Sequence, residues 1–162
     1  MKNKFLFTFS LAASLFFQSC TSTTAHNAEL APISLTGDFL FEGPNTLQAE
    51  NNLTLSNIMA KAGLKGVPAS VEVKKASLDL SAIEADWVES ATLQVSSKNL
   101  DMITIGTISV LNGEATGITL AEETNIQPYV EDEEMYWVLD VNVTNDLDDL
   151  SIPLELQLTI NQ

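Results

Sequence analysis

The chain lacks arginine and has few positive charges of any kind. Its 162 residues include seven Lys and no Arg against 22 Asp and Glu, which gives a formal net charge of −15. Nucleic acids are bound through clustered Lys and Arg, and anionic membrane surfaces attract basic segments in the same way. The composition therefore argues against nucleic-acid binding and against membrane binding through a basic patch.

Cysteine and histidine are also scarce, because Cys20 and His26 are the single residues of each type. One Cys excludes an intramolecular disulfide and a Cys-based metal cluster. No Gly-rich phosphate loop, G-x-S-x-G elbow or H-E-x-x-H zinc helix occurs, so we expect no enzyme and no cofactor. A small hydrolase with two carboxylates across a cleft, as in glycosidases, stays open as an alternative.

The N-terminus has the features of an export signal. Lys2 and Lys4 precede the stretch Phe5–Phe17, whose 13 residues are apolar apart from three hydroxyl side chains. A transmembrane helix needs roughly 20 apolar residues, whereas the core of a secretion signal is shorter. We therefore expect this segment to be removed from the mature protein.

The end of that stretch, Phe17-Gln18-Ser19-Cys20, resembles the lipobox of bacterial lipoproteins. It departs from the usual pattern at Phe17 and Gln18, where Leu and a small residue are commoner. The resemblance implies that lipid is attached to the Cys20 thiol and that acyl chains anchor the protein in a membrane. Thr21 stands where Asp would imply inner-membrane retention, so the resemblance implies the periplasmic face of the outer membrane. Plain secretion with cleavage after Ala25 is the alternative.

We expect three segments: a signal peptide over residues 1–19, a lipid-anchored flexible tether over 20–31, and one folded domain over 32–162. The tether is predicted because residues 21–31 are small, polar and aperiodic, and it contains His26. Residues 20–162 carry 22 Asp and Glu against five Lys, so the mature net charge is −17.

From residue 32 onward, apolar residues recur with a period of two, which is typical of strands with one buried face. The clearest stripes are Ile33–Phe41, Ala91–Val95, Met135–Val143 and Ile152–Ile160. We expect about seven strands in a single antiparallel β-sandwich. Trp87 or Trp137 is its largest expected core residue.

Several local signals refine this fold. The apolar phase shifts near Lys74-Lys75 and again around Gly106, and each shift predicts a β-bulge. Asn112-Gly113 predicts a hairpin turn. One short helix is expected over Asn57–Ala62, capped by Ser56 and ended by Gly63.

The stretch Leu93–Gly106, together with Leu111–Glu114, is similar to the Ig-like water-stress module of late-embryogenesis proteins. This resemblance covers about a quarter of the mature chain and implies an Ig-like arrangement of the strands.

Two acidic runs flank the strand expected at 135–144. One is Glu131–Glu134 and the other is Asn145–Asp149, at the opposite end of that strand. Calcium prefers about six to eight oxygen ligands, so Asp146, Asp148 and Asp149 are candidate metal ligands. A solvated acidic loop that keeps the protein soluble is the competing interpretation.

Tyr129 and Tyr136 are the candidate binding residues, because an exposed aromatic beside acids suits a sugar or a protein partner. Tyr136 faces away from Trp137 on the same strand and is expected on the surface. We expect a non-enzymatic, lipid-anchored envelope protein whose partners are the membrane, through Cys20, and another envelope protein or a glycan. A carbohydrate- or calcium-binding module is the alternative.

Overall fold

The computed structural model describes residues 23–51, 53–80, 87–111, 114–115, 118–122, 124–132 and 134–162. In chain order, these residues form β1 (Ala25–Glu29), β2 (Ile33–Gly37), β3 (Gly43–Asn51), α1 (Leu55–Ala62), β4 (Ser70–Leu78), β5 (Val88–Ser97), β6 (Ile103–Leu111), β7 (Glu114–Ala115), β8 (Thr119–Leu120), α2 (Gln127–Val130), β9 (Met135–Val143) and β10 (Leu150–Asn161). All the strand pairs between them are antiparallel. The predicted mainly β, antiparallel fold is confirmed.

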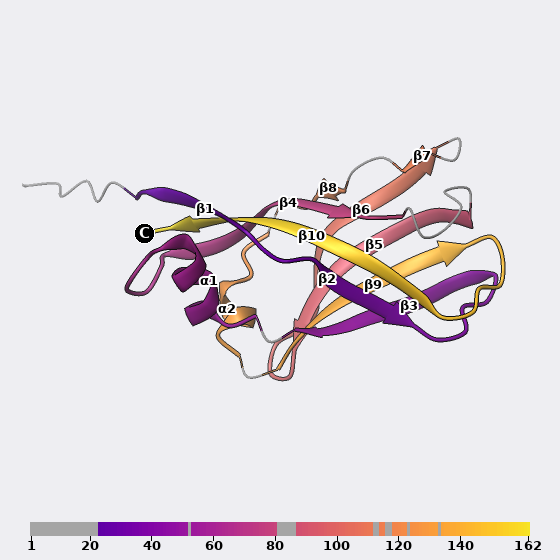
Figure 1. The fold of residues 1–162 in the computed structure, drawn as a ribbon, viewed down its shortest axis with the longest axis horizontal. Helices are drawn as coiled ribbons and strands as arrows, with labels where there is room; N and C mark the ends of the chain where they lie inside the picture. The colour runs from indigo at the N-terminus through magenta and orange to yellow at the C-terminus, as the bar shows by residue number, and fades with distance from the viewer. Residues whose placement is uncertain are drawn as a thin grey trace, which may run out of the picture.

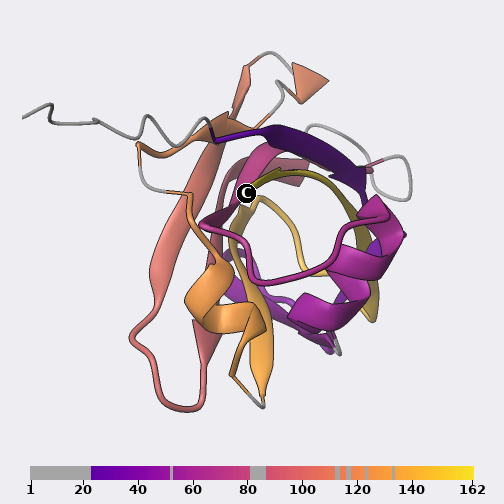
Figure 2. The ribbon, with the colours of Figure 1, turned by 90° about the vertical axis from the view of Figure 1, so that its left-hand side faces the viewer.

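The strands join into one curled sheet. Their order is β1-β10-β2-β3-β9-β5-β6-β7, with β4 on the other edge of β10 and β8 beside β6. Viewed from one end, the strands curve around a common interior (Figure 2). The arrangement is a half-barrel, so one continuous sheet takes the place of the two packed sheets expected of an Ig-like sandwich.

The segment around β8 connects β6, on one side of the curled sheet, to β4, on the other side. β8 pairs with β6, and Asn125 forms an isolated bridge with Glu72 on β4. The Ile126 amide donates to the Val71 carbonyl at 2.8 Å. These bonds connect β6 to β4 and draw the sheet edges toward each other.

β10 is the central strand of one wall. One of its edges pairs with β2 over Leu150–Leu154 and with β1 further along, while the other edge pairs with β4. Its even-numbered residues from Leu150 to Ile160 are all buried. The predicted apolar stripe over Ile152–Ile160 is confirmed.

Both predicted bulges are present. On β4, Gln157 pairs with Lys75 and Leu158 pairs with Val73, which leaves Lys74 as the extra residue. On β6, the pairing partners on either side of the shift are Thr104 and Gly106. Each bulge resets the alternation by one residue, which is why the apolar phase changes there. The predicted turn at Asn112-Gly113 lies outside the described residues.

The interior is filled by aliphatic side chains around Trp137, which is fully buried, whereas Trp87 is only half-buried. Ile58 and Met59 bring α1 into this core. The helix ends at Gly63 in the left-handed conformation, as predicted. Its N-cap is Thr54 rather than Ser56, so the helix begins two residues earlier than the sequence indicated.

The prediction of a flexible tether over residues 20–31 is wrong for residues 25–29, because these form β1 and belong to the sheet. Ala28 is buried, and His26 lies opposite Ile160 on β10. The folded domain therefore includes residues 24–31 as well as the predicted 32–162. The sequence pattern did not indicate this strand, because its buried residue is an alanine and it has no stripe of large aliphatic residues.

Candidate functional site: an acidic aromatic end of the half-barrel

Two loops meet at one end of the half-barrel. Residues 38–42 join β2 to β3, and residues 144–149 join β9 to β10 (Figure 1). Leu40 and Leu147 exchange two backbone hydrogen bonds, each of 2.9 Å. The Glu42 amide also donates to Asp146 Oδ1 at 2.8 Å. The two loops therefore form one surface, which we call the acidic end.

Two phenylalanines are exposed on this surface. Phe39 is 66% exposed and Phe41 is 67% exposed, whereas Leu40 between them is 3% exposed. The sequence stripe placed both rings in the core, and this prediction is wrong because β2 already ends at Gly37. Leu40 takes the inward position, so its neighbours face water. Phe39 also has a φ of +52°, a conformation that is strained for a residue with a bulky side chain.

Hydrogen bonds hold the loop that carries these rings. Asn45 accepts from the Phe41 amide at 3.0 Å through Oδ1 and donates to the Phe41 carbonyl at 2.7 Å through Nδ2. The rings are thus presented on a fixed backbone. A partner that binds a fixed surface loses less conformational entropy than one that must order a loop.

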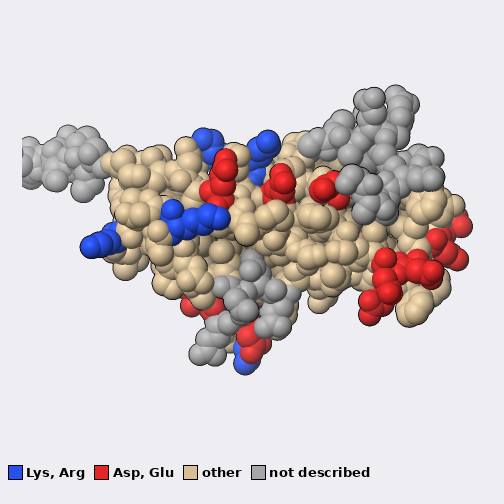
Figure 3. Space-filling view, in the orientation of Figure 1, with Lys and Arg blue, Asp and Glu red and all other residues tan. Residues whose placement is uncertain are grey.

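Acidic side chains surround the two rings. Five of them lie in the two loops and all are exposed: Asp38, Glu42, Asp146, Asp148 and Asp149. Neither loop contains a Lys. Figure 3 shows a cluster of acids at this end, opposite the end where two lysines project, with further acids along the middle of the molecule. This surface combines exposed apolar area with a concentrated negative charge.

The candidate metal ligands Asp146, Asp148 and Asp149 all lie on the acidic end, but they do not converge. Within the described part of the chain, no three His, Cys, Asp or Glu side chains are grouped so that they could hold a metal ion. One Asp146 oxygen instead accepts the Glu42 amide. All three side chains are exposed, and their role as calcium ligands stays a prediction.

The candidate binding residues Tyr129 and Tyr136 lie apart from this surface. Tyr129 is buried, and its hydroxyl donates to the Asp101 carbonyl at 2.7 Å, so its predicted binding role is wrong. Tyr136 is half-buried on the outer face of β9, opposite Ser96 of β5. Tyr129 therefore serves packing, while Tyr136 is partly accessible on the wall of the sheet.

The other acidic run is used to fasten a turn. Asp132 accepts the Asn99 amide at 3.1 Å and the Asn99 side-chain nitrogen at 2.8 Å. Lys98 forms an ion pair with Glu134 at 3.4 Å. These contacts tie the turn after β5 to the start of β9, so Asp132 and Glu134 both have structural partners.

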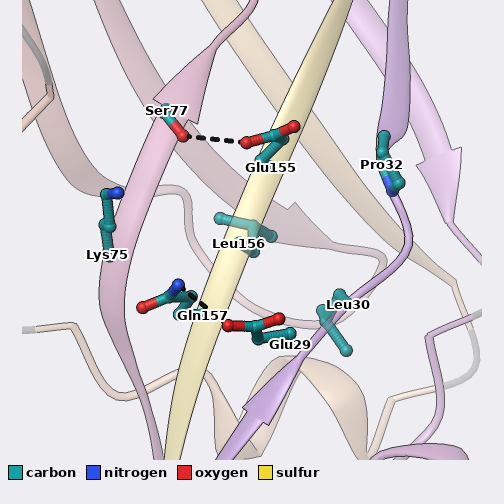
Figure 4. A pocket seen from close by; sticks show the side chains of 8 residues that line it. All are labelled: Glu29, Leu30, Pro32, Lys75, Ser77, Glu155, Leu156 and Gln157. Atoms are coloured by element: carbon teal, nitrogen blue, oxygen red, sulfur yellow. Dashed lines mark hydrogen bonds between the residues drawn. The ribbon is translucent and has the colours of Figure 1, made fainter.

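A hollow of about 200 Å³ opens where β1 gives way to β2 along β10 (Figure 4). Glu29 and Glu155 are its carboxylates, and Lys75 stands at its edge. Gln157 donates to Glu29 at 3.2 Å, and Ser77 donates to Glu155 at 3.5 Å. Both glutamates are exposed, so the hollow offers no water-excluded site of the kind that carboxylate chemistry uses.

A second shallow hollow lies on the outer face of β3, β9 and β5. Asp140 stands in it between Thr46 and Thr92, and the Thr46 hydroxyl donates to Asp140 Oδ1 at 2.7 Å. Apart from the Asp140 carboxylate, its lining is made of hydroxyl, amide and aliphatic groups, and it contains no aromatic ring on which a sugar could stack.

No protein-family model matches the chain, and a comparison with curated proteins finds no match either. Among the described residues, no helix has both the length and the apolar character needed to cross a bilayer. The candidate site therefore rests on the geometry of the acidic end.

Proposed function

We propose that this protein is a non-enzymatic, lipid-anchored protein of the cell envelope that binds a basic protein partner through its acidic end. The observation that carries the proposal is the pair Phe39 and Phe41, exposed beside five carboxylates. Aromatic residues are frequent anchors in protein interfaces, and exposed apolar area rimmed by polar groups is typical of a binding surface.

The charge of the acidic end selects the kind of partner. Two copies of this surface would repel each other, and an anionic membrane would repel it as well. A partner rich in Lys and Arg gains Coulomb attraction from the carboxylates and cation–π contacts from the two phenyl rings. We therefore propose a basic protein surface as the ligand.

The anchor in this proposal is Cys20, which lies outside the described residues, at the periplasmic face of the outer membrane. Thr24 lies at the end of the half-barrel that holds α1, away from the acidic end (Figure 1). A lipid at Cys20 would leave the acidic end pointing away from the bilayer. In that orientation the two rings are open to partners in the periplasm.

The anchor is tested by detergent phase separation of cells that make the full chain. The wild-type protein should enter the detergent phase, and Cys20→Ala should remain uncleaved or appear in the aqueous phase. Equal partitioning of the mature wild-type and variant proteins would refute the anchor.

The binding surface is tested by a photocrosslinking amino acid placed at Phe41 or, as a control, at Thr107 on the outer face of β6. We expect a discrete crosslinked product from position 41 that is lost when Asp148 and Asp149 are replaced by Lys. A product that forms equally from position 107, or that survives the charge reversal, would contradict the proposal.

A further inference from the structure

The end of the half-barrel opposite the acidic end carries two Lys on a segment without acids. It contains α1 and the loop of residues 63–69, which joins α1 to β4. Residues 53–69 include Lys61 and Lys65 and no Asp or Glu, and residues 20–28 contain no Asp or Glu either. In Figure 3 lysines occupy this end. The five Lys and 22 acids of residues 20–162 are thus unevenly distributed along the molecule.

The loop of residues 63–69 is fixed beside the point where the described chain begins. The Gln162 side chain donates to the Lys65 carbonyl at 2.8 Å, and the Ala69 amide donates to the Asn161 carbonyl at 2.6 Å. Gln162 in turn exchanges backbone hydrogen bonds with Thr24. Figure 2 views this end and shows α1, the loop and the C-terminus together.

The tip of this loop is apolar and unused by the core. Val67 is 79% exposed, the largest exposure among the exposed large hydrophobic residues of the described chain. Lys65 precedes it, and Lys61 projects from the last turn of α1. The nearest acid along β4, Glu72, is half-buried and accepts hydrogen bonds from Ser70 and Asn161.

We infer that Lys61, Lys65 and Val67 form a contact surface for anionic lipid headgroups. This inference rests on the proposed anchor at Cys20, which precedes Thr24 by four residues. Four residues reach at most about 14 Å even when fully extended. The anchor therefore keeps this end of the domain close to the headgroup layer, and the two Lys attract the lipid phosphates whenever they come within the Debye length of about 8 Å.

The contact gives the domain a fixed orientation on the bilayer. Val67 would sit among the headgroups with the two ammonium groups on the phosphates, while the acidic end lies several Debye lengths from the bilayer and is not repelled by it. The net charge of −17 does not show this arrangement, because it sums the many acids of the whole domain with the few Lys, two of which lie at this end. The sequence-based argument against a basic membrane contact therefore applies to the whole chain and not to this end.

The test uses the full-length protein, purified with its lipid and reconstituted in vesicles made of equal parts phosphatidylcholine and phosphatidylglycerol. An environment-sensitive fluorophore is attached to Val67→Cys or, at the opposite end, to Phe41→Cys. We expect a quencher carried on the lipid to quench the label at 67 several-fold more than the label at 41. Replacing phosphatidylglycerol with phosphatidylcholine should reduce that difference.

A charge-matched pair of variants isolates the lysines. Adding Lys61→Glu and Lys65→Glu to the labelled protein should remove most of the quenching at 67, whereas Lys74→Glu with Lys75→Glu on β4 should leave it. Equal loss from both pairs, or equal quenching at 67 and 41 while the protein stays in the vesicle fraction, would overturn the contact and leave the anchor standing. A wild-type protein that is absent from the vesicle fraction would overturn the anchor itself and the contact with it.

Discussion

Thr24 and Gln162 exchange two backbone hydrogen bonds, with the Thr24 amide 2.7 Å from the Gln162 carbonyl and the Gln162 amide 3.0 Å from the Thr24 carbonyl. This pair continues the ladder in which Ala25 lies opposite Asn161. Both ends of the described chain are therefore fastened to each other, and β1 is part of the domain.

The first prediction tests whether β1 is structural. Ala28→Asp places a charge at a buried position of β1 and should lower the free energy of unfolding by several kcal/mol. Ala25→Asp adds the same group to an exposed position of the same strand and should change it by less than about 0.5 kcal/mol. Urea denaturation measures both. If neither variant loses stability, residues 25–29 are a tether after all.

The second prediction separates stability from binding at Phe39. Because this residue has a positive φ, Phe39→Gly should leave the free energy of unfolding unchanged or raise it by up to about 1 kcal/mol. The same variant should weaken crosslinking from position 41, because a ring that contacts the partner is lost. Phe41→Gly, at an exposed position where φ is not positive, should not gain stability. A clear loss of stability in Phe39→Gly would show that the ring is held for structural reasons.

The third prediction concerns Gly106, where the backbone passes close to β8. A Cβ at this position would lie 2.6 Å from the Thr119 carbonyl oxygen and 2.6 Å from Ile118 Cγ2. Gly106→Ala should therefore push β8 away from β6 and destabilise the domain by about 1–3 kcal/mol. Thr107→Ala, at the adjacent exposed position, should cost less than about 1 kcal/mol. Thermal unfolding followed by circular dichroism distinguishes the two.

The fourth prediction concerns the excess of acids. Residues 99–162 contain 13 Asp and Glu and no Lys, so mutual repulsion should lower stability at low salt. Monovalent salt should raise the melting temperature, since the Debye length falls to about 8 Å at 0.15 M. Calcium added in high salt should have little further effect, because the acids of the 146–149 loop do not converge.

Asp148→Asn should then change the melting temperature no more than Glu131→Gln, an exposed acid in the other run. A calcium-dependent rise that persists in high salt and disappears in Asp148→Asn would instead establish a specific ion site.

Local pattern predicted much of the sheet correctly. The stripes of β9 and β10, the bulges near Lys74 and Gly106, and the end of α1 at Gly63 all follow from residue spacing and glycine geometry. The curvature of the sheet could not be predicted from local pattern, because it depends on which strands pair across long distances in the sequence. Leu154, for example, pairs with Ile33 on one edge of β10 and with Leu78 on the other edge. The residues near Leu154 in the sequence do not indicate either partner.

The candidate site was mostly misplaced for a related reason. Phe39 and Phe41 extend the alternation of β2, and only the turn residues Gly37 and Asp38 signalled that the strand stops before them. Tyr129 was expected at the surface because of the acids beside it. It is buried instead, and its hydroxyl donates a hydrogen bond to the carbonyl of Asp101, 28 residues away in the sequence. The Asp-rich loop was located correctly, but the sequence did not show that Asp146 accepts a hydrogen bond from the Glu42 amide of a distant loop.

The position of β10 has a consequence for how the protein is made. β1, β2 and β4 all pair with this strand, and it is translated after every one of them. Until residues 150–161 have been synthesised, one wall of the half-barrel lacks its central strand, and β1, β2 and β4 each have an edge without a partner strand. A chain with such long-range pairing folds late and slowly, so its edges are exposed to aggregation during synthesis. Under the proposed export of this protein, the same delay would keep the chain unfolded and able to pass through a translocation channel until synthesis of the domain is almost finished.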